Sequence, residues 1–224
     1  MDVAAGGFPR RLADTLQTPD EHDGSLQLLG SLVEMLDHTD SFMAGHSQRV
    51  ADLATSLARI ADLAPSDIEK VRRAALVHDI GKNSIPERVL RKHDALTNDE
   101  LHLIRLHPIF GASMLSRVPG MEQIVSIVLH HHEHWDGSGY PAGLSMTDIP
   151  RESRIIAVAD AFDAMTSYRP YGEVLSSEEA LAEIRRCAGT QFDPMLVDAM
   201  HEAFLYGLLT KKRSSLGEVK LQTV

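Results

Sequence analysis

Histidine and aspartate residues occur in this chain in patterns that suit metal ligation. The chain has twelve histidines among 224 residues, and neutral imidazole is the commonest metal ligand in proteins. His78 and Asp79 end an apolar segment with helical spacing, where the negative end of a helix dipole favours a bound cation. For this pair taken alone, a salt bridge from Asp79 to Lys82 or Arg73 is the favoured interpretation.

A run of histidines at 130–134 is harder to explain without a metal. It closes the apolar segment 124–129. Adjacent residues on a helix point about 100° apart, so His131 and His132 serve two neighbouring metals readily and one metal only with reach. The alternative is a partly exposed polar helix end, an interpretation that suits His130 and His134.

Two carboxylates, Asp160 and Asp163, lie three residues apart on one face of an almost wholly apolar predicted helix. A carboxylate in such surroundings needs a cation, a hydrogen-bond donor or a shifted pKa. Ligation and a structural hydrogen bond are open for each; we assign ligation to Asp160 and a supporting role to Asp163. His46 and His107 complete the candidates, although an isolated histidine is more often a surface or satisfied core residue.

The elements that must position these residues read as helices. Thr97 and Glu100 form a capping-box pattern, and we expect Gly81 to cap the helix that begins at Pro65. Strand-like alternation is hard to find and aromatic residues make up only 5% of the chain. Apolar spacing predicts helices over 26–36, 46–60, 65–81, 97–107, 109–117, 121–132, 154–167, 177–187 and 194–209, with one short helix within 84–96. We therefore predict a single all-α domain over 26–208, with a short N-terminal extension at 1–25 and a polar tail at 209–224.

Composition excludes several classes of protein. The single cysteine, Cys187, excludes an internal disulfide framework and agrees with a reducing cytoplasm. No segment approaches the roughly 20 apolar residues of a membrane span, and no secretory signal is evident. The net charge of −10 argues against a nucleic-acid polymer as partner. It leaves room for a small anionic ligand, provided that the site carries its own positive charge.

Four segments resemble the signature of the HD-GYP subfamily of HD-domain phosphohydrolases, in the order that the family has. They are His78-Asp79-Ile80-Gly81-Lys82; His131-His132-Glu133 with Asp136-Gly137-Ser138-Gly139-Tyr140-Pro141; Asp160 to Ser167 with Arg169-Pro170-Tyr171; and Gly189-Thr190 with Phe192-Asp193-Pro194. The resemblance covers residues 26–208. It implies an all-α HD-domain helical bundle and a bacterial phosphodiesterase that hydrolyses cyclic di-GMP at a metal cluster.

The resemblance also implies two divalent metal ions, and the mixed imidazole and carboxylate set suits iron or manganese. A water bridging two metals about 3.5–4 Å apart would attack phosphorus in line, giving pGpG and, after a second cut, GMP. By the resemblance one metal is held by His46, His78, Asp79 and Asp160, and the other by His107, His131 and His132, with Asp79 bridging. Asp79 and Lys82 are the implied catalytic residues, and the implied substrate contacts are Lys82, Tyr140, Arg169 and Tyr171.

Two positions depart from the family pattern. Phe42 stands where some relatives have a glutamate that helps to hold a third metal, so we expect two metals and a reaction that can stop at pGpG. Gly172 stands where relatives often have a basic residue, which bears on nucleotide affinity.

Two further readings stay open. One is a phosphodiesterase for another cyclic dinucleotide, such as cyclic GMP–AMP. The other is a weakly active signalling module that presents the loop Gly139-Tyr140-Pro141 to a diguanylate cyclase domain. Because the chain retains every residue of the two-metal set, we place catalysis first. A homodimer is compatible with either reading.

Overall fold

The computed structural model describes residues 45–92, 94–167 and 174–205, and every regular element in these ranges is a helix. No strand occurs there, which confirms the all-α prediction. The α-helices are α2 (His46–Ile60), α3 (Pro65–Val77), α4 (Glu87–Leu90), α5 (Asn98–Ile104), α6 (His107–Leu115), α7 (Glu122–Leu129), α8 (Arg151–Thr166), α9 (Ser177–Arg186) and α10 (Pro194–Leu205), and the short 3₁₀ helices are η2 (Ile80–Ser84) and η3 (Met146–Asp148).

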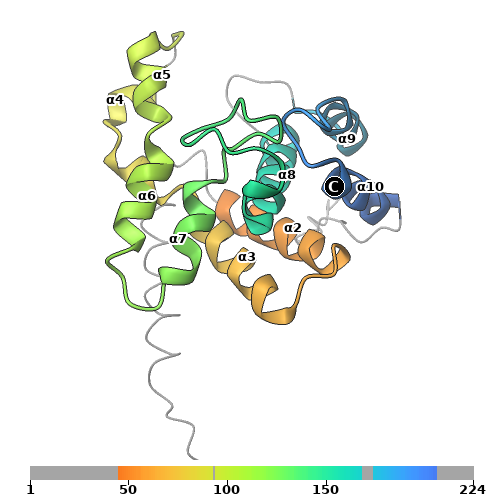
Figure 1. Cartoon of the computed structure of the whole chain (residues 1–224). Coiled ribbons are helices and arrows are strands. Elements are labelled where there is room, and N and C mark those ends of the chain that lie inside the picture. Colours follow the sequence, from red (N-terminus) through yellow and green to blue (C-terminus); the bar gives the residue numbers. More distant parts are fainter. Residues whose placement is uncertain (1–44, 93, 168–173, 206–224) are drawn as a thin grey trace, which may run out of the picture.

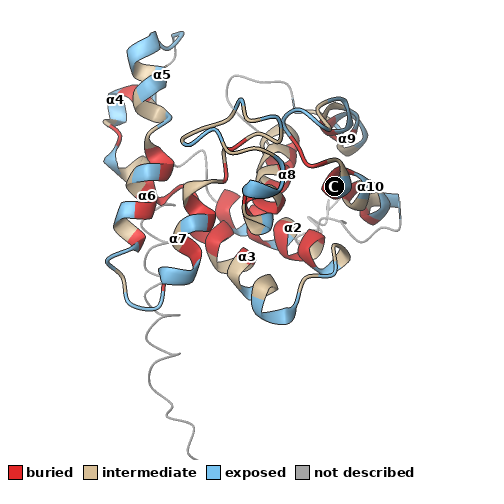
Figure 2. Ribbon diagram, viewed as in Figure 1, coloured by how far each residue is buried: buried red, intermediate tan, exposed pale blue. Residues whose placement is uncertain are grey.

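Helix α2 lies at the centre of the bundle. It packs against α3 and α8, while α3 also contacts α7 and α6 packs on both η2 and α7. These helices carry the buried faces that Figure 2 shows in red. Their inward side chains are almost all aliphatic, with Leu57, Ile80, Ile124, Ile155 and Ile156 among the largest that are fully buried. The aliphatic core therefore fixes the relative positions of the helix ends that carry the polar residues discussed below.

Helices α4 and α5 form one edge of the molecule, and α9 and α10 form the opposite edge (Figure 1). Helix α5 begins at the predicted capping box: the Thr97 hydroxyl accepts from the Glu100 amide, and the Glu100 carboxylate accepts from the Thr97 amide. Helix α5 buries none of its own residues. It reaches the site through the segment that joins it to α6.

Several predicted helix ends are wrong, including that of α5, which ends at Ile104 and not at 107, and two others matter for the site. Helix α3 ends at Val77, with His78 as its C-cap. Gly81 is not a cap but lies inside η2, where a Cβ would overlap the carbonyl oxygen of His107 and approach the Gly111 nitrogen to 2.5 Å. Close packing of η2 on α6, which local spacing cannot reveal, is the reason for glycine here.

The second error concerns α7, which ends at Leu129. His131 and His132 therefore lie in a turn beyond the helix, and the 100° helical spacing expected between them does not apply. Other helices begin earlier than predicted. Helix α6 begins at His107, with Pro108 in its first turn, and α8 begins at Arg151.

Several predictions fall outside the described residues. These are the helix at 26–36, the boundaries at 25/26 and 208/209, and the residues Phe42, Arg169, Tyr171 and Gly172. Within the described ranges, no helix combines the length and the apolar character needed to cross a membrane.

Candidate metal centre

The ends of four helices and the middle of a fifth converge on one polar cluster. His46 begins α2, His78 and Asp79 follow α3, His107 begins α6, the turn after α7 holds the two adjacent histidines, and α8 contributes a carboxylate from its interior. The cluster contains all seven residues predicted as metal ligands: His46, His78, Asp79, His107, His131, His132 and Asp160. Five of the seven are buried, and the other two, His132 and Asp160, are half-buried.

The cluster divides into two groups of donor atoms that share Asp79. One group is His46, His78 and Asp79, and the other is Asp79, His107, His131 and His132; within each, the donor atoms lie within 4.8 Å of one another. Asp160 joins the first group, because its Oδ1 atom lies 3.2 Å from His46 Nε2 and 3.9 Å from His78 Nε2. This arrangement places a carboxylate between two sets of imidazoles.

The backbone orients three of the histidines. The Nδ1 atoms of His78, His107 and His131 lie 2.8, 2.9 and 2.6 Å from the carbonyl oxygens of Ala75, Ile104 and Val128. Because a carbonyl can only accept, Nδ1 carries the proton and Nε2 is the atom turned into the cluster. A hydrogen bond of this kind fixes the tautomer of a metal-binding histidine.

Asp163 orients the fourth histidine. Its Oδ2 atom accepts from His46 Nδ1 at 2.8 Å, and its Oδ1 atom accepts from Arg49 Nε at 2.7 Å. The Asp163 side chain is 2% exposed, so Arg49 compensates a buried charge. The sequence pattern gave Asp163 a supporting role but missed Arg49. Its position three residues after His46, on the same face of α2, was an available signal.

Electrostatics favour the metal-binding protonation state of several residues of the cluster, but not of His46. Burial, with smaller effects from neighbouring imidazoles, holds the pKa of His131 well below its usual value and lowers that of His132 to about 3. Although burial opposes it, Lys82 and nearby histidines hold the pKa of Asp79 far below normal. Against its burial, the Asp160 and Asp163 carboxylates raise the pKa of His46 to about 9. Neutral imidazoles and charged carboxylates are the forms that bind metals, so His131, His132 and Asp79 are already in the binding form, whereas His46 has to release a proton when a metal binds.

Two buried nitrogen atoms provide the test of fit for a metal. His46 Nε2 and His78 Nε2 are both buried, and neither has a hydrogen-bond partner among the residues that the structure describes. A buried polar atom without a partner costs free energy, and both atoms point at carboxylate oxygens that would share a cation with them. The donor set therefore fits a divalent metal.

Lys82 lies at the edge of this cluster. Its Nζ atom is 2.5 Å from Asp79 Oδ2, and its side chain is 29% exposed. The salt bridge considered for Asp79 thus exists with Lys82. Arg73, the other candidate, instead donates to the carbonyl of Gly120.

The loop after the histidine run folds back over the cluster. The Tyr140 amide donates to the His132 carbonyl at 3.1 Å, and the two rings stack with centroids 5.0 Å apart and planes at 26°. Glu133, whose side chain is fully buried, accepts from the amides of Ala142 at 2.7 Å and Leu144 at 3.1 Å. The sequence pattern assigned no role to Glu133, which clamps the loop that carries Tyr140.

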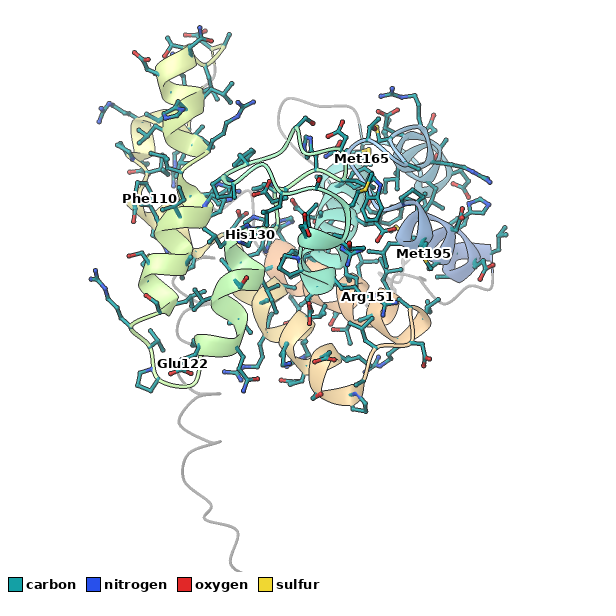
Figure 3. All side chains as sticks on the ribbon, in the orientation of Figure 1. Phe110, Glu122, His130, Arg151, Met165 and Met195 are labelled. Atoms are coloured by element: carbon teal, nitrogen blue, oxygen red, sulfur yellow. The ribbon has the colours of Figure 1, made fainter. Side chains whose placement is uncertain are left out.

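His130 and His134 belong to neither donor group. His130 lies where α7 meets the following loop (Figure 3), with Nδ1 3.4 Å from Glu133 Oε1. His134 Nδ1 is 2.9 Å from the Ser138 hydroxyl. Both therefore make contacts within the loop, as a polar helix end would.

A second polar network joins this loop to the segment before α10. The amides of Trp135 and Asp136 donate to the carbonyls of Gln191 and Thr190. Arg154 pairs with Asp193 at 2.6 Å, and its guanidinium lies over the Trp135 ring, 5.5 Å from the centroid. The loop is thus held from both sides.

Comparison with known proteins agrees with this architecture. The family model described as HD domain matches residues 30–196. The cyclic di-GMP phosphodiesterase response regulator RpfG of Xanthomonas campestris is 38% identical over 176 residues, which is 78% of this chain and 47% of the relative. A cyclic di-GMP phosphodiesterase of Thermotoga maritima is 38% identical over 179 residues, covering 79% and 49%. The chain spans about half the length of these relatives.

A relative with a different named substrate is also similar. The 3'3'-cGAMP-specific phosphodiesterase 2 of Vibrio cholerae is 34% identical over 185 residues, covering 82% of this chain and 35% of the relative. Among solved structures, a cyclic GMP-AMP specific phosphodiesterase of the same species has a TM-score of 0.66 at 23% identity, covering 82% of this chain and 49% of that one. These matches confirm the resemblance seen in the sequence, and the chain belongs to the HD domain family.

Proposed function

We propose that this chain is a metal-dependent phosphodiesterase that hydrolyses cyclic di-GMP to pGpG. The observation that carries the proposal is the convergence of seven metal-binding side chains on one buried cluster, with Lys82 and Tyr140 at its edge. The names of the relatives at 38% identity support the choice of substrate. The family membership supports the chemistry. The same proposal places the domain at residues 26–208.

The cluster would hold two divalent metal ions, with iron and manganese the best matches to imidazole and carboxylate donors. Such ions supply Lewis acidity to a phosphate oxygen and lower the pKa of water. The first site would use His46, His78, Asp79 and Asp160, and the second Asp79, His107, His131 and His132. Asp79 is the residue common to both sites, which is why we assign it a catalytic role.

The protein's own contribution is orientation and charge. Backbone carbonyls and Asp163 hold the imidazoles, so the donor atoms need little rearrangement on metal binding. Lys82 is a partly exposed cation beside the shared carboxylate and would donate to a phosphate oxygen. Burial, followed by the nearby Asp79 charge, raises the pKa of Tyr140 to about 12, so its hydroxyl stays protonated and can donate to the substrate.

Other parts of the proposal rest on residues outside the described ranges. Arg169 and Tyr171 would contact the nucleotide. Phe42 has no carboxylate with which to hold a third metal, so we propose two metals per chain and pGpG as the main product. A diguanylate cyclase partner for the loop Gly139-Tyr140-Pro141 and a homodimer remain predictions.

The decisive experiment purifies the protein without oxygen, measures its metal content, and follows cyclic di-GMP by chromatography. We expect about two metals per chain, pGpG as the first product, and loss of turnover with a chelator that added Mn²⁺ or Fe²⁺ restores. A metal-loaded protein that leaves cyclic di-GMP intact would contradict the proposal.

A second candidate substrate is 3'3'-cGAMP, since a relative of 34% identity is named for it. The two substrates are compared by kcat/KM on the same preparation. We expect cyclic di-GMP to have the higher value. A reversed order would favour the second candidate while leaving the phosphodiesterase chemistry intact.

A further inference from the structure

Arg105 lies at the outer end of a row of side chains that starts in the metal centre. It is the exposed C-cap residue of α5, two positions before His107. Its guanidinium carbon is 5.6 Å from the centroid of the Tyr140 ring. Tyr140 stacks in turn on His132, one of the proposed ligands. The row runs from the cluster to the surface through contacts between named side chains.

The surroundings of the Arg105 guanidinium differ from those of the other cationic side chains near the site. Lys82 pairs with Asp79, and Arg49 pairs with Asp163. In the ranges that the structure describes, no carboxylate lies within 4.0 Å of the Arg105 guanidinium. The acidic residue Glu100 of α5 pairs with Lys92 instead. Arg105 therefore presents a guanidinium whose planar array of N–H donors suits a phosphate.

The substrate that we propose has a matching requirement. Cyclic di-GMP carries two phosphodiester groups, and only one can be at the metal centre during a single cleavage. The other must be accommodated by a protein of net charge −10. Arg105 is separated from the cluster by the Tyr140 and His132 rings, so it is not placed to contact the phosphate under attack.

We propose that Arg105 binds the phosphodiester of the cyclic dinucleotide that is not being cleaved. This inference rests on the proposed function and extends it to selectivity. A substrate with two phosphodiesters linked in a ring gains a contact at the rim, whereas a simple phosphodiester gains none. Stacking on Tyr140 limits the freedom of the guanidinium before the substrate arrives.

The test compares two substrates in Arg105→Gln. Cyclic di-GMP has the second phosphodiester, and bis(p-nitrophenyl) phosphate lacks it. A charge-assisted hydrogen bond is worth about 1.5–3 kcal/mol, so we expect KM for cyclic di-GMP to rise at least about tenfold with little change in kcat. For bis(p-nitrophenyl) phosphate we expect both constants to stay within about twofold of the wild type, since no charge-assisted contact is lost.

Two control variants sharpen the result. Arg117→Gln removes the same charge from another exposed arginine, beyond the opposite end of α6, and should leave both substrates unaffected. Arg105→Lys keeps the charge and loses the planar fork, so it should restore part of the affinity for cyclic di-GMP. A thermal melt of each variant checks that the fold is unchanged.

The possible outcomes separate the inference from the function beneath it. Equal losses on both substrates in Arg105→Gln would mean that Arg105 acts only by supporting Tyr140 and His132, and would overturn the inference. An unchanged KM for cyclic di-GMP in an active enzyme would overturn it as well. A wild type that cleaves bis(p-nitrophenyl) phosphate but not cyclic di-GMP would instead contradict the proposed function, and the Arg105 assignment with it.

Discussion

His107 and His131 face each other through their Nε2 atoms, 3.3 Å apart. His107 donates its Nδ1 proton to the backbone carbonyl of Ile104, and His131 donates its Nδ1 proton to that of Val128. When neither Nε2 atom carries a proton, the two lone pairs are directed at each other inside a buried site, which is unfavourable unless they share a cation. The pair therefore supports a metal at this end of the cluster, where Asp79 Oδ1 lies 3.3 Å from His107 Nε2.

The first prediction concerns the different roles of His131 and His130 in metal binding. His131→Ala should lower the bound metal by about one ion per chain, because it removes an oriented Nε2 donor. His130→Ala is the matched control and should retain full metal, since its Nδ1 atom lies 3.4 Å from Glu133 and His130 belongs to neither donor group. Elemental analysis of reconstituted protein measures both. If His130→Ala lost metal while His131→Ala did not, the assignment of roles along the histidine run would be wrong.

Asp79 is expected to have a larger effect than any single histidine. It belongs to both donor groups, so Asp79→Ala should reduce metal at both sites and abolish hydrolysis of cyclic di-GMP. The same elemental analysis, paired with product chromatography, tests this. Full metal occupancy with normal turnover in Asp79→Ala would refute the shared-carboxylate arrangement.

We expect substitution of Lys82 to lower turnover without changing the metal content. Its ammonium pairs with Asp79 but offers no lone pair to a metal. Lys82→Ala should keep its metal content and lose about 10- to 100-fold in kcat/KM, in line with one charge-assisted hydrogen bond to the transition state. Parallel losses of metal and activity would show that Lys82 maintains the position of Asp79 instead.

Local signals in the sequence predicted most of the helical framework. Helix α2 has the predicted bounds, and the capping box at Thr97 and Glu100 forms as expected. Such features depend on residues a few positions apart, which a sequence displays directly. The all-α class followed from the same spacing.

Features that depend on tertiary contact were not predictable in this way. The sequence pattern suggested that Gly81 caps a helix. The close contact between Gly81 and the carbonyl of His107 cannot be inferred from residues nearby in the sequence. Nothing in the local sequence marks Arg105, which stands between Ile104 and Leu106, and only the fold brings the Tyr140 ring close to its guanidinium. Composition and spacing alone indicated a metal site in a helical domain, whereas the grouping of the ligands came from the family resemblance.

Glu133 offers a test of the loop that covers the cluster. Its two carboxylate oxygens accept from the amides of Ala142 and Leu144. A glutamine has a single acceptor oxygen, so Glu133→Gln should leave one of these part-buried amides without its charged acceptor, at a cost of at most about 1.5–3 kcal/mol. We expect faster hydrogen exchange at these two amides and a higher KM, because Tyr140 loses its fixed position.

The matched control for this change is Glu178→Gln, an exposed carboxylate in α9. It removes the same charge and should alter neither exchange in the loop nor KM. Unchanged protection of Ala142 and Leu144 in Glu133→Gln would show that the loop is held by other contacts, such as the amides of Trp135 and Asp136.

Gly81 provides the last prediction, which concerns stability and metal binding together. A methyl group at Gly81 would overlap the backbone of His107 and press on the Gly111 nitrogen, and neither backbone group can rotate away. Gly81→Ala must therefore separate η2 from α6, and with them Asp79 from His107. We expect the free energy of unfolding to fall by at least about 1–3 kcal/mol, the usual cost of overpacking, together with weaker metal binding.

Gly189→Ala is the control, because its φ is +80° but the nearest contact of an added Cβ would be at 3.9 Å. That variant should lose about 1 kcal/mol from backbone strain and keep its metal affinity. Urea unfolding of the metal-free proteins measures stability, and a separate titration of the folded proteins measures metal affinity. Failure of Gly81→Ala to accumulate as folded protein would agree with the expected loss of stability. Equal stability of the two variants would show that η2 and α6 can move apart without cost, and that their contact does not fix the distance between Asp79 and His107.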